Sequence, residues 1–80
     1  KDVKFGSVYP NPSSNYFNID LGPLKENVVI TVFDIEGKQI EQKRVTSKSK
    51  IEIGSTWKAG IYIVQIIQDG ERRTLRLVKQ

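Results

Sequence analysis

Apolar residues recur in short stretches separated by Gly, Pro, Asn and Asp at intervals of about ten residues, which is typical of β-sandwiches and barrels. Over residues 16–21 the alternation is regular, and Phe17, Ile19 and Leu21 fall on one face of an extended chain. No stretch sustains the period of a helix. The pattern predicts a half-buried strand here and an all-β fold overall.

Two stretches are apolar enough to belong to the centre of a core. Residues 28–35 carry β-branched side chains on both faces, which favours a central strand covered on both sides. Residues 61–67 form the most apolar run of the chain. Residues 38–45 are predicted to return from the first stretch as a polar strand, with Ile40 as the clearest apolar anchor.

Glycine-containing turns join these stretches into hairpins. Gly37 follows the first central strand and supplies the positive φ of a tight turn, and Asp69-Gly70 favours a type I′ turn before the last strand. With further strands at residues 3–9 and 51–53, the chain has about seven strands. We therefore expect an immunoglobulin-like antiparallel β-sandwich; the order of the strands within its sheets stays open.

Size and composition exclude most enzyme classes. A chain of 80 residues accommodates one domain and no deep cleft. It contains no Cys, His or Met, so it has no thiolate nucleophile, no imidazole base and no zinc-finger site. We expect no catalytic residue, no metal and no cofactor. Because the chain begins at Lys1 without a signal peptide or a membrane-spanning run, we interpret it as a piece of a longer protein with no direct membrane insertion.

The net charge of +4 permits an acidic partner, but the basic residues are spread along the chain. They concentrate only in the last strand, which has no aromatic residues on which bases could stack. We therefore expect a solvated polar face and no nucleic-acid binding. A Ser-Lys pair within residues 47–50 would sit in a polar loop that cannot desolvate its lysine, so it is not expected to be catalytic.

Three segments carry more information than a generic sandwich requires. The first is Tyr9-Pro10-Asn11-Pro12, whose prolines stiffen the approach to the second strand. The second is a strand end in which Asp34 is placed to accept backbone hydrogen bonds and Gly37 completes the turn. The third begins at Ala59-Gly60-Ile61-Tyr62 and ends with Leu75-Arg76-Leu77-Val78-Lys79.

Taken in this order, the segments resemble the C-terminal sorting domain of cargo proteins of the type IX secretion system of Bacteroidetes. That family shows a Tyr-Pro-Asn-Pro box, a hydrophobic-Asp-hydrophobic-x-Gly-Lys/Arg turn, an Ala/Pro-Gly-hydrophobic-Tyr strand and a basic-hydrophobic terminal strand. The resemblance covers nearly the whole chain. Gln80 extends one residue past the usual terminal Lys, and residues 39–58 match no family motif.

The resemblance implies that residues 1–80 are a single C-terminal sorting domain of a longer secreted protein. Its implied partners are the type IX translocon, a sortase-like peptidase and the upstream cargo domain. The cargo would pass through the periplasm and reach the cell surface or the medium, commonly after cleavage of the domain and attachment of the cargo to a lipopolysaccharide. Dimerisation through a sheet edge stays open. Recognition roles are implied for Pro10, Asn11, Pro12, Asp34, Gly37, Gly60, Tyr62, Leu75, Arg76, Leu77, Val78 and Lys79.

Two other functions compete with this interpretation. A structural or adhesive spacer similar to fibronectin type III modules would share the fold and the lack of catalytic groups, but further domains would normally follow it. A carbohydrate-binding module would need exposed aromatic residues, for which Trp57, Tyr9 and Tyr62 are the candidates. If the sorting interpretation holds, we expect the last strand and the Pro10-Asn11-Pro12 segment to form the recognised surface together.

Overall fold

The computed structural model describes residues 7–22, 27–46, 50–68 and 70–80. Within these ranges the chain forms seven strands and no helix, so none of them contains a helix that could cross a membrane. In chain order the strands are β1 (Ser7–Tyr9), β2 (Phe17–Asp20), β3 (Val28–Asp34), β4 (Gln39–Val45), β5 (Lys50–Ile53), β6 (Gly60–Gln68) and β7 (Glu71–Lys79).

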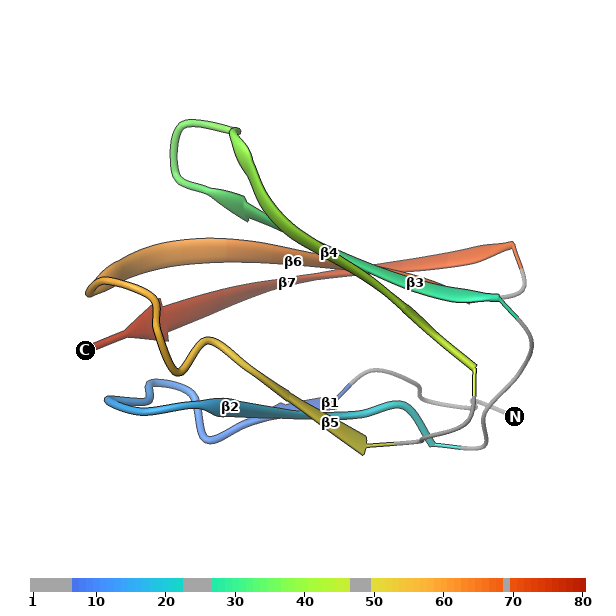
Figure 1. Cartoon of the computed structure of the whole chain (residues 1–80), viewed down its shortest axis with the longest axis horizontal. Helices are drawn as coiled ribbons and strands as arrows, with labels where there is room; N and C mark the ends of the chain where they lie inside the picture. Colours follow the sequence, from blue (N-terminus) through green and yellow to red (C-terminus); the bar gives the residue numbers. More distant parts are fainter. Residues whose placement is uncertain (1–6, 23–26, 47–49, 69) are drawn as a thin grey trace.

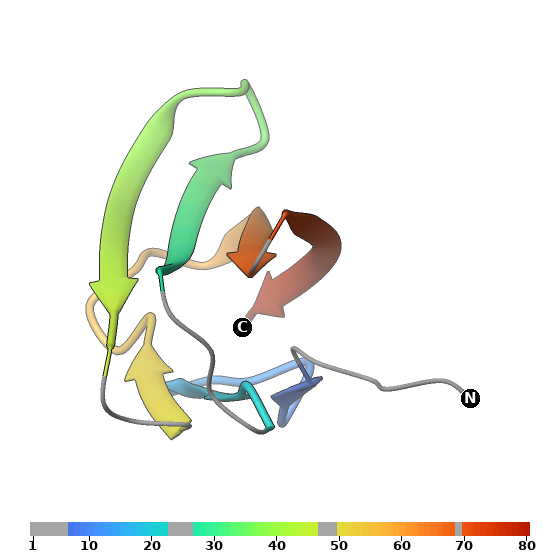
Figure 2. The ribbon, with the colours of Figure 1, turned by 90° about the vertical axis from the view of Figure 1, so that its right-hand side faces the viewer.

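The strands form two antiparallel sheets that face each other as two layers (Figures 1 and 2). One sheet has three strands in the order β1-β2-β5, and the other has four in the order β4-β3-β6-β7. Each sheet also contains antiparallel pairs of strands that are not consecutive in sequence: β2 pairs with β5, and β3 pairs with β6. The predicted immunoglobulin-like antiparallel sandwich is confirmed.

The core lies between the two layers and follows from the alternation of side chains along each strand. Phe17, Ile19 and Leu21 are fully buried, as their alternation predicts, and they face apolar side chains of the four-stranded sheet. β6 lies between β3 and β7 in that sheet, and it alternates strictly between buried and half-buried residues over most of its length. The core residues contributed by the four-stranded sheet are Val28, Ile30, Val32, Val45, Tyr62, Val64, Ile66 and Leu77.

Two expectations about the first central hairpin are wrong. Ile40 is 39% exposed and does not anchor β4, whereas Val45 at the other end of that strand is buried. The pairing register shifts between Val32, which pairs with Glu41, and Phe33, which pairs with Gln39, so the shift skips Ile40. Beyond this irregularity the hairpin extends away from the three-stranded sheet (Figure 1). β3 is central, between β4 and β6, but its outer face is only partly covered, since Val29 and Phe33 stay half-buried.

The last hairpin has the connection length that its sequence predicts. Gln68 pairs with Glu71 across a two-residue loop, and Gly70 has a φ of 84°. Asp69, the other residue of the predicted type I′ turn, lies outside the described residues, as do residues 3–6 of the predicted first strand. This hairpin places β7 at the edge of the four-stranded sheet.

Candidate functional site

The Tyr-Pro-Asn-Pro box lies against the outer edge of β7. The Asn11 side chain donates from Nδ2 to the carbonyl oxygen of Arg76 at 2.9 Å, and its Oδ1 accepts from the N–H of Val78 at 2.9 Å. A side-chain amide presents a donor and an acceptor side by side, as a strand backbone does. Asn11 therefore makes the two hydrogen bonds that a neighbouring strand would make with β7.

Ser13 continues this contact with its backbone. Its N–H donates to the carbonyl oxygen of Val78 at 3.0 Å, and its carbonyl oxygen accepts from the N–H of Gln80 at 2.8 Å. The hydroxyl of Ser13 is also held, because it donates to the carbonyl oxygen of Tyr16 at 2.7 Å. Pro10 and Pro12 on either side of Asn11 lack an N–H, and the Tyr9-Pro10 and Asn11-Pro12 peptide bonds are cis. Residues 11–13 thus act as a short strand along the C-terminal end of β7.

The inner face of β7 is buried in the core. Leu77 is fully buried and pairs with Tyr62, and Lys79 is only 6% exposed and pairs with Gly60. The Lys79 ammonium donates to the carbonyl oxygen of Gly54. The terminal lysine of the motif is therefore an internal contact, and a partner meeting the folded domain would not touch it.

A turn that precedes β6 receives Lys79. The carbonyl oxygen of Gly54 also accepts from the N–H of Trp57 at 3.1 Å, and Gly54 has a φ of 89°. A Cβ at Gly54 would lie 2.9 Å from Cδ1 of Phe17, so the backbone conformation and the packing both favour glycine. The Trp57 ring stacks at centroid distances of 5.8 Å from Phe17 and 4.5 Å from Tyr62. Trp57 and Tyr62 are thus packing residues rather than sugar-binding platforms.

Two replacements of Lys79 separate the contribution of its packing to stability from the contribution of its charge. We expect Lys79→Ala to lower the free energy of unfolding by about 2 kcal/mol, because roughly three buried methylenes are lost. Lys79→Met keeps comparable packing, and the Gly54 carbonyl keeps its bond from Trp57, so its effect should stay within about 1 kcal/mol. Urea denaturation of the isolated domain measures both. Equal destabilisation by the two variants would show that the ammonium, and not the packing, holds the end of β7.

The Asp34 turn is built as predicted. Oδ1 of Asp34 accepts from the N–H groups of Glu36 and Lys38, each at 2.9 Å, and Gly37 has a φ of 88° with open space around it. The N–H of Asp34 donates to the carbonyl oxygen of Lys38 at 2.9 Å, which closes the hairpin. This hairpin carries β4, the edge of the sheet opposite to β7. Asp34 and Gly37 are therefore not part of the surface formed by the box and β7.

Loss of the Asp34 carboxylate should loosen this turn. We expect Asp34→Ala to lower the free energy of unfolding by about 1 to 2 kcal/mol, because two backbone N–H groups lose their acceptor. Asp34→Asn keeps an oxygen acceptor and should lose less than Asp34→Ala. Thermal unfolding followed by circular dichroism compares the two. An Asp34→Ala variant as stable as the wild type would show that water replaces the carboxylate without cost.

The structure sorts the predicted recognition residues by what they do. The motifs at the two ends of the chain meet, because Asn11 bonds to β7, while Gly60 and Tyr62 lie on the neighbouring strand opposite Lys79 and Leu77. Tyr62, Leu77 and Lys79 are buried, and Asp34, Leu75 and Val78 are half-buried. Those exposed to solvent are Pro10, Asn11, Pro12, Gly37, Gly60 and Arg76.

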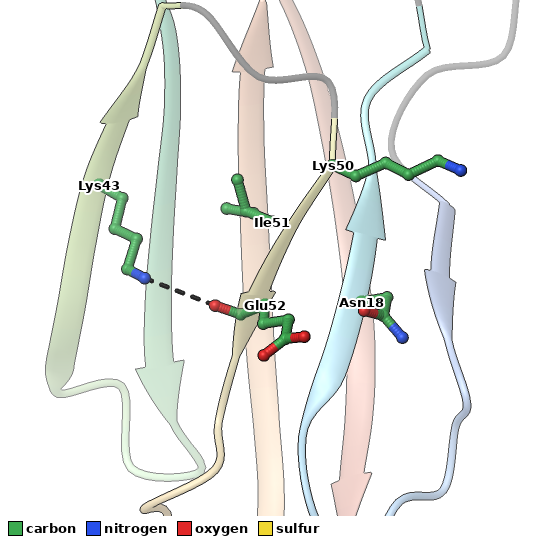
Figure 3. Close-up of a pocket in the computed structure, with 5 residues that line it drawn as sticks. All are labelled: Asn18, Lys43, Lys50, Ile51 and Glu52. Carbon is green, nitrogen blue, oxygen red and sulfur yellow. Dashed lines mark hydrogen bonds between the residues drawn. The ribbon is translucent and has the colours of Figure 1, made fainter.

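The described surface includes a hollow at each of two places that bear on the site. One runs beside the box and the chain end and is lined by residues that include Pro10, Pro12, Tyr16 and Gln80. The other lies over β2, β4 and β5, where the Lys43 ammonium donates to the carbonyl oxygen of Glu52 at 3.5 Å (Figure 3). Among the described residues, no group of three or more His, Cys, Asp and Glu could hold a metal ion.

The Gly54–Trp57 turn is the part of the site that sequence reasoning missed. No motif is recognisable in the sequence of residues 39–58, and nothing in their local pattern connects Gly54 to a lysine 25 positions away. The available signal was a glycine three residues before the only Trp of the chain.

Comparison with known protein families identifies the same segments of the chain. No curated protein matches the chain. Residues 7–80, which include the box, the Asp34 turn and β7, match the model of the family described as the secretion system C-terminal sorting domain. The chain therefore belongs to the family of C-terminal sorting domains found on type IX secretion cargo proteins.

Proposed function

We propose that residues 1–80 are a single sorting domain at the end of a longer secreted protein and that the type IX translocon recognises it to carry the attached cargo across the outer membrane. Membership of the family supports this role, since a type IX sorting signal implies interaction with the secretion machinery and export to the surface or the medium. The cargo passes through the periplasm on its way. The domain catalyses no reaction, which agrees with a sequence that contains neither His nor Cys.

The observation that carries the proposal is the pair of hydrogen bonds between the Asn11 amide and β7, one donated and one accepted by Asn11, which joins two motifs 65 to 67 positions apart. Exposed Pro10, Pro12 and Arg76 thereby lie on one composite surface. Buried Leu77 and Lys79 support this surface from within. A partner that reads the folded domain therefore meets the box and the last strand together.

Processing after export belongs to the same proposal. A sortase-like peptidase removes the domain and couples the cargo to an anionic lipopolysaccharide at the cell surface. The domain contributes a folded, exposed signal to this step, and the peptidase supplies the chemistry. The family resemblance supports this sequence of events.

A fusion protein tests the sorting role. Residues 1–80 are placed at the C-terminus of a fluorescent protein with an inner-membrane export signal, and the fusion is expressed in a type IX-competent bacterium. We expect fluorescence at the cell surface or in the medium, and its loss in a translocon-deficient strain. Retention in the periplasm of both strains would favour the fibronectin-like spacer.

A further inference from the structure

The outer edge of β7 is only partly covered by the box. Arg76 and Val78 direct backbone groups outward, because they bond to Asn11 and Ser13. Backbone hydrogen-bonding groups alternate sides along an antiparallel strand, so Arg72 and Thr74 direct theirs outward as well. No described residue outside β7 is paired with the backbone of these two on that side. As far as the described residues show, an open stretch of strand edge therefore precedes the stretch that residues 11–13 cover.

The open stretch is basic. Arg72 and Arg76 are exposed, and they lie on the same face of β7 as Thr74 because they are two positions from it in either direction. A strand added here would bring its own side chains beside two guanidinium groups. Guanidinium groups bind carboxylates in a two-pronged geometry, so the edge favours an acidic partner strand.

We propose that residues 72–74 are a strand-addition site for an extended segment of a secretion-machinery protein that carries two carboxylates, four positions apart, on one face. This inference rests on the proposed function and specifies its partner. The box limits the added strand on one side, since Asn11 already bonds to the carbonyl oxygen of Arg76 and Ser13 occupies the edge beyond it. Main-chain hydrogen bonds supply affinity in such contacts, and side chains supply specificity.

A second copy of the domain fits this edge less well. An antiparallel copy centred on Thr74 would place Arg72 opposite Arg76 of the other chain and Arg76 opposite Arg72. Like charges directly opposite each other destabilise a strand pair. Charge complementarity therefore selects an acidic segment over self-association.

Proline at position 74 tests the backbone contact. Thr74→Pro removes the outward N–H but no hydrogen bond to β6, and proline is tolerated on edge strands where the N–H faces solvent. In the fluorescent fusion we expect Thr74→Pro to fold, as circular dichroism reports, and its export to fall to the level of the translocon-deficient strain. Thr74→Val, which keeps the N–H, should be exported better than Thr74→Pro. Equal export of folded Thr74→Pro and Thr74→Val would overturn the proposal, while export of the wild-type fusion would leave the sorting role standing.

Charge reversal tests whether the partner segment carries carboxylates. It also tests the proposed surface if Thr74→Pro does not fold. We expect the double variant Arg72→Glu/Arg76→Glu to lose export. The control Arg44→Glu/Lys50→Glu makes the same change of net charge on exposed residues outside the proposed surface, and it should retain export. Equal export of the two double variants would overturn the proposal that the partner segment is acidic. A wild-type dimer in sedimentation that Thr74→Pro dissociates would assign the edge to a second copy and overturn the proposal as well.

Discussion

Deleting residues 77–80 is expected to abolish export of a fused cargo and to unfold the domain. Leu77 is fully buried, and losing a buried Leu side chain costs about 2 to 5 kcal/mol. The deletion also removes the Lys79 contact to Gly54 and the outer-edge bond between Gln80 and Ser13. A domain of this size has a total stability of about 4 to 12 kcal/mol, so the truncated chain should lose most of it. Circular dichroism of the isolated domain and localisation of the fusion report the two effects.

Folding and recognition must be separated in this deletion, because it removes both a core residue and part of the recognised surface. Normal export of the truncated fusion would contradict the proposed role of the last strand. Loss of export without loss of folding would place the whole effect in recognition. The supporting contacts of Leu77 and Lys79 lead us to expect that both are lost together.

Truncating Phe17 should have the second largest effect. Phe17 is fully buried at the start of β2, and its ring lies 5.8 Å from that of Trp57. We expect Phe17→Ala to lower the free energy of unfolding by about 3 to 5 kcal/mol, because the facing layers cannot close the resulting cavity. Urea denaturation measures this loss.

The neighbouring Tyr16 provides a matched control, since it is also aromatic but 37% exposed. Tyr16→Ala should cost less than about 1 kcal/mol. Similar losses in the two variants would mean that Phe17 is not the core residue that its burial indicates.

Much of the fold was predictable because burial in a sandwich follows the alternation of side chains along each strand. The alternation in β2 and the apolar run in β6 both reported the core correctly. The failure at Ile40 has the same physical origin: a pattern shows which residues are apolar, but not where a register shift carries a hairpin beyond the facing sheet.

The candidate site was predictable only in part. The motifs pointed to two segments that the structure brings together, the box and the last strand. The Asp34 turn could be derived locally because all its hydrogen bonds span four residues or fewer. The contact of Asn11 with β7 depends on how the two sheets pack, which no local pattern encodes. Likewise, the burial of Lys79 reversed the natural expectation that a terminal basic residue faces a partner.

The Asn11 amide offers the most direct test that the box and the last strand act as one surface. Asn11→Ala removes both bonds to β7 and leaves every core residue in place, so the variant should fold. We would measure its export as a fluorescent fusion beside the wild type and a translocon-deficient strain. We expect Asn11→Ala fluorescence to stay in the cell, as in the deficient strain; wild-type export of this variant would contradict the composite surface.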